Sequence, residues 1–170
     1  MKPQLWFFAS VAFSLVAWGL VAARYIWPAL RTRSRTEALR SLLVLNTFRF
    51  LGLAFLIPGV VSPDLPSSFA HAAAYGDLIA TVLALLSLLS LESAAGTVMI
   101  WIFNLWGTAD LLNAFYQGNH AALQPGQLGA TYFIPTFGVP LFLIVHGLMF
   151  RILLRRRSEA VVRELAVHSS

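Results

Sequence analysis

The chain alternates between long apolar runs and short polar connections, and this alternation defines the elements we expect. An α-helix needs about 20 largely apolar residues to cross the hydrocarbon of a bilayer. Five runs reach that length, at residues 5–26, 42–61, 72–91, 97–116 and 132–154. The pattern predicts an all-α integral membrane protein in which residues 1–157 form one bundle of five transmembrane helices. Residues 158–170 are predicted to be a short cytoplasmic tail.

Composition supports a membrane protein and excludes several classes of chemistry. Only 11% of the residues are charged and 58% are hydrophobic, whereas a soluble domain carries about twice that charged fraction. The basic residues lie at the ends of apolar runs, so they indicate the lipid bilayer as a partner and no nucleic acid. The chain has no cysteine, which excludes thiolate catalysis, disulfide exchange and cysteine-ligated metals.

The distribution of basic residues predicts the orientation of the bundle. The first connection holds Arg31, Arg33, Arg35 and Arg40, and the end of the fifth run holds Arg151, Arg155, Arg156 and Arg157. The second and fourth connections contain no Lys or Arg. Because cytoplasmic segments carry the excess of positive charge, we expect the N-terminus outside and the C-terminus in the cytoplasm. The abundance of Arg over Lys favours a multi-pass protein of a bacterial inner membrane.

The first run could alternatively be a signal peptide, because small residues near its end would allow cleavage. Cleavage would leave the Arg-rich connection outside, against the charge rule. We therefore favour an uncleaved first helix.

Polar residues in the fourth run give the main candidate site. At 100° per residue, one helical stripe holds Trp106, Asp110, Asn113 and Gln117, and a nearly opposite stripe holds Thr97, Trp101, Asn104 and Thr108. A helix that is polar on two sides packs between neighbours and does not face lipid. An intramembrane carboxylate costs about 2.5–3.5 kcal/mol and is therefore a functional candidate.

Asp77 in the third run is expected to lie at a similar depth to Asp110. At 1.5 Å per residue, Asp77 and Asp110 lie about 7 and 10 Å below the outer boundary. Asp77 shares a face with small residues that let a neighbouring helix come close. Such a pair could exchange protons, bind a cation or act as acid and base; alternatively, each Asp fixes packing separately. The candidate ligand pocket comprises Asp77, Trp106, Asp110, Asn113, Gln117 and His120.

Secondary candidates lie elsewhere in the runs, at Asn46, Arg49, His71, Asn104 and His146. Depth counting separates Arg49 from Asp110 by about 10 Å, which favours snorkelling of Arg49 to lipid headgroups over pairing with an Asp. His146 has no mate at ligand spacing, so we expect it to be a hydrogen-bonded packing residue, and we expect no metal site. Pro135 and Pro140 should kink the fifth helix beside the polar stripe and so favour a cavity there.

Three functions remain open at this point, and the sequence leaves any cofactor unknown. The first is binding or transport of a small molecule, ion or proton through an outward-facing acidic pocket, which is the one we favour. The second is an intramembrane enzyme acting on a lipid or isoprenoid, with Asp110 as acid or base. The third is an accessory subunit of a larger membrane complex. Translocation by so small a bundle would require a homo-oligomer.

Overall fold

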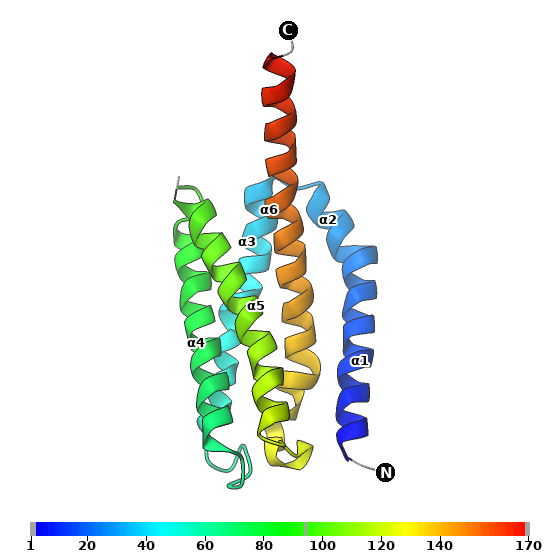
Figure 1. Ribbon diagram of the computed structural model, residues 1–170, viewed down its shortest axis with the longest axis vertical. Helices are drawn as coiled ribbons and strands as arrows, with labels where there is room; N and C mark the ends of the chain where they lie inside the picture. The colour runs from blue at the N-terminus through cyan, green and yellow to red at the C-terminus, as the bar shows by residue number, and fades with distance from the viewer. Residues whose placement is uncertain (1–2, 94, 169–170) are drawn as a thin grey trace.

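The computed structural model describes residues 3–93 and 95–168, which form helices joined by short connections (Figure 1). Five helices are long and apolar enough to cross a membrane: Pro3–Arg31, Arg35–Leu56, Ser67–Leu89, Gly96–His120 and Ile134–Arg155. The predicted helical class and the number of membrane-length helices are thereby confirmed. The side chains of the predicted tail, residues 158–170, lie outside the described part of the chain.

The described residues form ten helical elements, of which all but η3 belong to the five long helices. These are α1 (Pro3–Val21), η1 (Ala22–Ile26), α2 (Trp27–Arg31), α3 (Arg35–Asn46), η2 (Thr47–Leu56), α4 (Ser67–Leu89), α5 (Gly96–His120), η3 (Pro125–Tyr132), η4 (Ile134–Gly138) and α6 (Val139–His168). In Figure 1, α3, α4, α5 and α6 form the body of the bundle, and α1 runs along the α6 side. The C-terminal part of α6 extends beyond one end of the bundle.

The second span begins seven residues earlier than predicted, at Arg35 rather than at residue 42. Ser34 and Glu37 form a capping box that fixes this start. The Ser34 hydroxyl accepts from the Glu37 backbone N–H at 3.2 Å, and the Ser34 N–H donates to the Glu37 carboxylate at 3.1 Å. Both bonds satisfy amide groups that a helix start otherwise leaves without partners, so polar residues extend the helix beyond its apolar part.

Small residues allow α4 to pack closely against η2, as the sequence suggested. The buried face of α4 includes Ala70, Ala73, Ala74, Gly76, Ala80 and Ala84. The facing segment η2 is a 3₁₀-helix of ten residues, although such helices rarely exceed three or four. Its tight winding places Arg49, Gly52 and Phe55 among the buried residues of the bundle.

Two apolar clusters fill the bundle, one toward each end. The larger one is centred on Leu39, Leu43, Phe103 and Met149, and the smaller one on residues such as Phe55, Phe69 and Leu128. Between them lie buried polar side chains: Asn46, Arg49, Asp77, Asn104 and His146. The core of the bundle is therefore divided by a polar layer.

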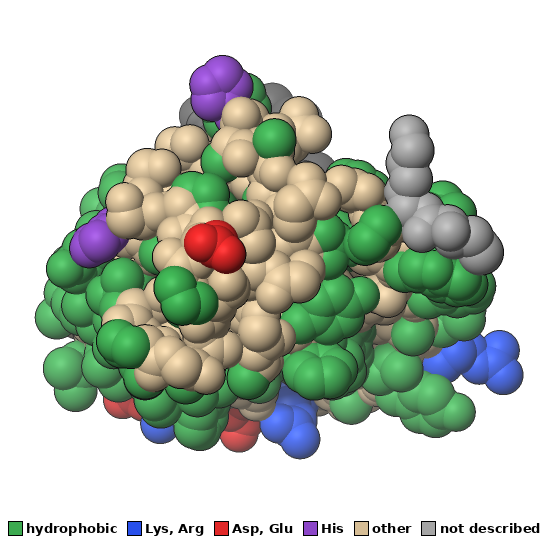
Figure 2. All heavy atoms as spheres, turned by 90° about the horizontal axis from the view of Figure 1, so that it is seen from below, with side chains coloured by type: hydrophobic (Ala, Val, Ile, Leu, Met, Phe, Trp, Pro, Cys, Tyr) green, Lys and Arg blue, Asp and Glu red, His purple; other side chains and the backbone are tan. Residues whose placement is uncertain are grey.

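The connections at residues 57–66 and 121–133 are hydrogen-bonded to each other at the end of the smaller cluster. Ser62 N–H donates to the Gln127 carbonyl at 3.0 Å, and Ala130 N–H donates to the Val60 carbonyl at 2.9 Å. Gly129 has a positive φ of 53° and packs against Val60. Figure 2 shows this end of the molecule, where the basic side chains are confined to the margin of the view.

Candidate functional site

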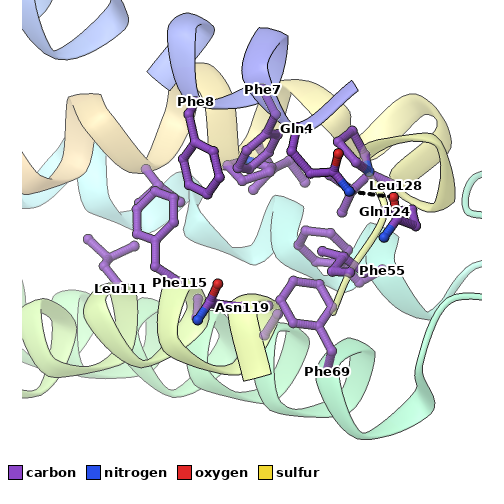
Figure 3. Close-up of a pocket in the computed structure, with 18 of the residues that line it drawn as sticks. Gln4, Phe7, Phe8, Phe55, Phe69, Leu111, Phe115, Asn119, Gln124 and Leu128 are labelled. Atoms are coloured by element: carbon purple, nitrogen blue, oxygen red, sulfur yellow. Dashed lines mark hydrogen bonds between the residues drawn. The ribbon is translucent and has the colours of Figure 1, made fainter. Parts of the chain in front are cut away.

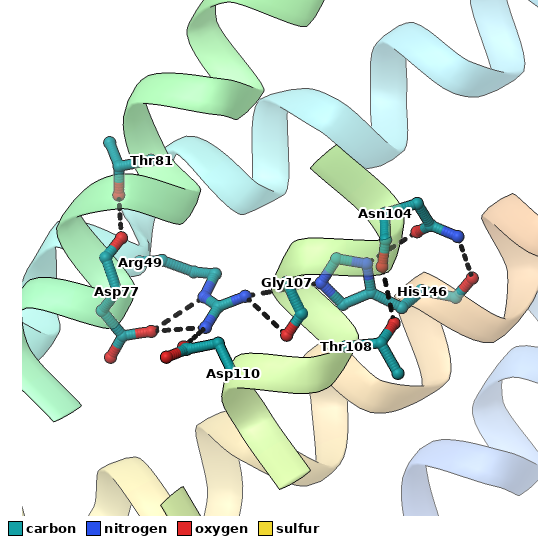
Figure 4. Close-up of polar contacts among 8 residues, drawn as sticks. All are labelled: Arg49, Asp77, Thr81, Asn104, Gly107, Thr108, Asp110 and His146. Atoms are coloured by element: carbon teal, nitrogen blue, oxygen red, sulfur yellow. Dashed lines mark hydrogen bonds and ion pairs between the residues drawn. The ribbon is translucent and has the colours of Figure 1, made fainter. Parts of the chain in front are cut away.

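Arg49 is almost completely buried, at 1% exposure, and it joins two carboxylates from different helices (Figure 4). Its Nε and Nη2 approach Asp77 Oδ1 at 2.8 and 2.7 Å. Its Nη2 also donates to Asp110 Oδ2 at 2.5 Å. One guanidinium therefore links η2 to α4 and α5, with the short distances typical of charge-assisted hydrogen bonds.

The remaining nitrogen of the Arg49 guanidinium, Nη1, also has polar partners. Nη1 donates to the Gly107 carbonyl at 3.2 Å and lies 3.4 Å from His146 Nε2. The guanidinium lies 5.7 Å from the centroid of the Phe142 ring, within reach of a cation–π contact. An arginine has five N–H donors, and Arg49 makes five polar contacts, with Asp77, Asp110, Gly107 and His146. These contacts hold the guanidinium in position.

Asn104 sets the orientation and tautomer of the His146 ring. The Asn104 amide nitrogen donates to the His146 carbonyl at 3.3 Å, so its oxygen is the atom that accepts from His146 Nδ1 at 2.6 Å. His146 then carries a proton on Nδ1 and presents the lone pair of Nε2 to Arg49. We call Arg49, Asp77, Asp110, Asn104 and His146 the Arg49 site.

The expected snorkelling of Arg49 is wrong, because Arg49 pairs with both Asp residues. The expectation counted depth from residue 42, whereas α3 begins at Arg35. Arg49 and Asp110 are each 14 residues beyond the first residue of their span, and Asp77 is 12 residues before the end of α4. At 1.5 Å per residue all three lie about 18–21 Å from the same end of the bundle.

Three glycines make room for the Arg49 site. A Cβ atom built on Gly52 would meet the Asp77 side chain, and one on Gly76 would meet the Asp110 carboxylate. A Cβ on Gly107 would lie 2.5 Å from the His146 ring and 2.9 Å from Arg49 Nη1. The absence of these Cβ atoms allows charged side chains to pack directly against helix backbones.

A cavity of about 380 Å³ opens beside the Arg49 site, and Asp77 and Asp110 both line it. The remainder is mainly apolar and includes five phenylalanines: Phe7, Phe8, Phe55, Phe69 and Phe115. Figure 3 shows Phe7 and Phe8 of α1 on one side of this space, with Leu111 and Phe115 of α5 across from them. Pro135 also lines the space, in the irregular segment where the sequence favoured a cavity. We call this space the aromatic cavity.

One oxygen of each carboxylate is not bound to Arg49. Asp77 binds Arg49 through Oδ1 and Asp110 binds it through Oδ2. Within the described residues, Asp77 Oδ2 and Asp110 Oδ1 accept no hydrogen bond. The two side chains are 13% and 11% exposed, so they are not sealed from the aromatic cavity. Asp77 Oδ2 packs against Gly52 and Asp110 Oδ1 packs against Gly76, so a molecule in the cavity would meet only this small exposed part of the two carboxylates.

The structure separates Asp77 and Asp110 from the other residues of the predicted pocket. Trp106 is 42% exposed, Asn113 and His120 are exposed, and Gln117 is half-buried. These four residues do not line the aromatic cavity. The buried face of α5 instead includes Phe103, Asn104, Gly107 and Leu111, and Asp110 lies at the edge of that face.

Three of the secondary candidates belong to the Arg49 site, and two lie outside it. Asn104 and His146 join Arg49 in one site, whereas Asn46 donates to the Leu42 carbonyl of its own helix at 2.9 Å. His71 is exposed and bonds the Ser67 carbonyl at 2.7 Å. Among the side chains that the structure describes, in residues 3–93 and 95–155, no group of three His, Cys, Asp or Glu is placed to hold a metal ion.

Sequence reasoning missed the residues that line most of the aromatic cavity. Gln4, Phe7 and Phe8 come from α1, and Gln124 and Leu128 come from η3 and the connection before it. The phenylalanines gave no signal because they are scattered through apolar runs in which a lipid-facing and a buried phenylalanine look alike. For Arg49, a signal was available in the capping-box sequence at residues 34–37.

We expect Asn104→Ala to destabilise the fold by about 1–3 kcal/mol, because it leaves buried donor and acceptor groups of His146 without partners. Asn113→Ala, at an exposed position of the same helix, should change stability by no more than about 0.5 kcal/mol. Thermal unfolding of both variants in a mild detergent measures the difference. Equal stability of the two variants would mean that Asn104 does not hold His146.

Residues 6–154 match the model of a protein family described as Domain of unknown function (DUF8737). The match covers most of the 170 residues, so the chain belongs to this family. The matched region contains the whole Arg49 site and all of the aromatic cavity except Gln4. No curated protein and no solved structure matches the chain.

Proposed function

We propose that this chain, a member of that family, binds a small amphipathic molecule in the aromatic cavity. The apolar part of the ligand would lie among the phenylalanines, and a cationic or hydrogen-bond-donating group would meet Asp77 and Asp110. The observation that carries the proposal is that both carboxylates line a cavity of about 380 Å³ whose other walls are mainly apolar. Apolar pockets with a few convergent polar groups are typical of small-molecule sites.

Charge balance favours a ligand that brings a positive charge or a proton. With both carboxyl groups ionised, Arg49 neutralises one of them and one negative charge remains. Arg49 is enclosed by its five contacts and does not line the aromatic cavity. An approaching ligand therefore meets carboxylate oxygens and not the guanidinium, so an anionic head group is disfavoured.

A hydrogen bond joins two polar residues that line the aromatic cavity. Gln4 of α1 donates from its side-chain amide to the Gln124 side-chain oxygen at 2.7 Å. Both residues line the cavity, and the bond is exposed. A single exposed hydrogen bond is weak, so separation of α1 from the connection before η3 gives a low-cost route for entry of the ligand.

We infer that the protein lies in a membrane with the aromatic cavity toward the outer side. The Arg-rich segments gather at the opposite end of the bundle, which is the arrangement expected for a cytoplasmic end. The ligand would then enter from the outer leaflet or the outer solution. Transport across a bacterial inner membrane is the extension of binding that we favour.

The alternative function is acid–base catalysis on an apolar substrate such as a lipid or isoprenoid. The observation that favours it is that two carboxylates line a mainly apolar cavity, and one oxygen of each is not bound to Arg49. Binding and catalysis differ in one readout. An enzyme would release its substrate as a chemically different product, whereas a transporter would release its ligand unchanged. Mass spectrometry of the released molecule distinguishes the two.

Three probes with the same ring system test the binding proposal. Naphthylmethylamine, naphthylmethanol and naphthoic acid differ in head group but share an apolar body that suits the aromatic cavity. We expect the amine to raise the thermal unfolding temperature most, the alcohol less and the acid least. A ligand present at 100 times its Kd stabilises a fold by about 2.7 kcal/mol. Equal or stronger stabilisation by the acid would overturn the proposal.

We expect Asp110→Asn to remove the preference for the amine. The variant keeps the Arg49–Asp77 ion pair, in which one positive charge now meets one negative charge, so the protein should still fold. Loss of a hydrogen bond between charged groups costs about 1.5–3 kcal/mol, which weakens amine binding about 10- to 100-fold. The alcohol should bind nearly as before. Unchanged amine affinity in this variant would show that the carboxylate does not contact the head group.

The apolar wall needs its own control. Phe115→Ala should weaken all three probes together, because Phe115 lines the aromatic cavity. Phe13→Ala should weaken none, because Phe13 is 77% exposed on α1 and does not line the cavity. Equal effects of the two variants would place the probes on the outer surface and not in the cavity.

A further inference from the structure

A second cavity, of about 310 Å³, lies at the opposite end of the bundle. It is lined by Trp27, Leu30, Arg31, Arg33, Arg35, Ala38, Ile152 and Arg155. Its four arginines come from the end of α2, the following connection, the start of α3 and the end of the fifth span. None of the lining residues is acidic. We call this space the basic cavity.

Neither Glu37 nor Glu92 lines the basic cavity. Glu37 caps the start of α3 through its hydrogen bonds with Ser34. Glu92 forms an ion pair with Arg40 at 2.6 Å, and Arg40 does not line the basic cavity. Arg33 donates to the Ser41 hydroxyl at 3.2 Å, which is an uncharged partner. Arg31 and Arg33 therefore bring positive charge to a cavity wall that contains no acidic side chain.

The walls of the basic cavity suit a group that is anionic at one end and apolar at the other. Leu30 and Ala38 are buried, at 5% and 2% exposure, and form an apolar floor. The Trp27 ring is fixed by the Arg151 guanidinium, which lies 3.9 Å from its centroid. Basic clefts between helices near the membrane surface are suited to phosphate-bearing lipid head groups.

The position of the basic cavity along the spans agrees with that chemistry. The first span ends at Arg31, the second begins at Arg35 and the fifth ends at Arg155. Residues at the ends of spans lie at the depth of the lipid head groups. Arginine is also the side chain best suited to a phosphate, because its planar fork binds two oxygens at once.

We propose that the basic cavity is a binding site for a phosphate group, carried either by the head group of an anionic phospholipid or by a soluble phosphate. The apolar floor and the position at the ends of three spans favour the lipid as the source. This site is separate from the aromatic cavity, and it does not depend on the function proposed for that cavity.

The experiment uses the full chain purified in a mild detergent. Native mass spectrometry would measure binding of dioleoyl phosphatidylglycerol and of dioleoyl phosphatidylcholine, and thermal unfolding would measure the effect of inorganic phosphate. We compare Arg31→Gln/Arg33→Gln with the control Arg24→Gln/Arg40→Gln. Both variants remove two positive charges, but only the first pair lines the basic cavity. Because these arginines are exposed, both variants should remain folded.

We expect the wild-type chain to bind phosphatidylglycerol more tightly than phosphatidylcholine. Arg31→Gln/Arg33→Gln should lose about tenfold or more of that affinity, and the control pair less than about twofold. Stabilisation by inorganic phosphate that depends on Arg31 and Arg33, without a preference for phosphatidylglycerol, would support the site with a soluble phosphate as the source. Equal losses in both double variants, or no binding of any of these ligands, would overturn the proposal.

Discussion

Replacing Arg49 by Met should destabilise the bundle by about 3–5 kcal/mol, which is the usual cost of removing one partner from a buried ion pair. The Arg49 side chain is fully buried and holds Asp77 and Asp110 at 2.7 and 2.5 Å. Methionine keeps the length and apolar stem of the side chain but leaves two neighbouring carboxylates without a cation. Unfolding by SDS titration in a mild detergent would measure the loss.

Two further variants separate the ion pairs from simple packing. Arg49→Met/Asp77→Asn/Asp110→Asn removes all three charges and should recover much of the lost stability, because no buried charge is left uncompensated. Arg40→Met breaks an ion pair whose side chains are 53% and 77% exposed, so its effect should stay below about 1 kcal/mol. If Arg49→Met is no less stable than Arg40→Met, the buried pairs do not hold the bundle together.

The number of membrane-length helices could be predicted from the sequence because it depends on one physical quantity, the length of each apolar run. A comparison of the length of each apolar run with the bilayer thickness gives five helices, and the described residues contain five helices of that length. The helix ends could not be read from hydropathy in the same way, because capping and polar first turns extend a helix beyond its apolar part. The start of α3 at Arg35 is the clearest case, and there the Ser34–Glu37 capping box was the missed signal.

That one boundary decided the interpretation of Arg49. Counted from residue 42, Arg49 lies too far from Asp110 to pair with it, and snorkelling is the natural inference. Counted from Arg35, Arg49 lies level with both Asp77 and Asp110. A seven-residue shift at 1.5 Å per residue is about 10 Å, which is the whole of the separation that argued against pairing.

The lining of the aromatic cavity was beyond sequence reasoning for a different reason. In a soluble protein the apolar face of a helix identifies its buried side, but lipid is as apolar as a helix–helix interface. Trp106 and Asp110 fall on one stripe of α5, yet Trp106 is exposed and only Asp110 reaches the cavity. Which face is buried depends on how α4 and α6 pack against α5, and the local pattern does not encode it.

The two cavities place different chemistry at the two ends of one bundle. The aromatic cavity offers carboxylate oxygens, whereas the basic cavity offers guanidinium groups. Between them, Arg49 faces Asp77 and Asp110 on one side and His146 with Asn104 on the other (Figure 4). A ligand that displaces one carboxylate from Arg49 would therefore disturb a junction of η2, α4, α5 and α6, because the same guanidinium holds all four.

Gly52→Ala should destabilise the fold by about 1–3 kcal/mol, the usual cost of overpacking a filled core. The new Cβ would lie 2.7 Å from both Cβ and Cγ of Asp77. The Asp77 Cβ is fixed to the α4 backbone, so η2 and α4 must separate or Asp77 must leave Arg49. Alanine is favoured over glycine in a helix by up to about 1 kcal/mol, which is too small to offset the clash.

The matched control is Gly147→Ala in α6, where a Cβ would meet nothing within 4 Å. Helix propensity acts alone at that position, so this variant should equal the wild-type chain or exceed it in stability. The two substitutions therefore have opposite expected signs in one SDS titration. Gly52→Ala should also weaken binding of naphthylmethylamine, because movement of Asp77 disturbs a wall of the aromatic cavity. A Gly52→Ala variant as stable as Gly147→Ala would show that close approach of η2 to Asp77 is not required, and that Arg49 can bind its carboxylates across a wider gap.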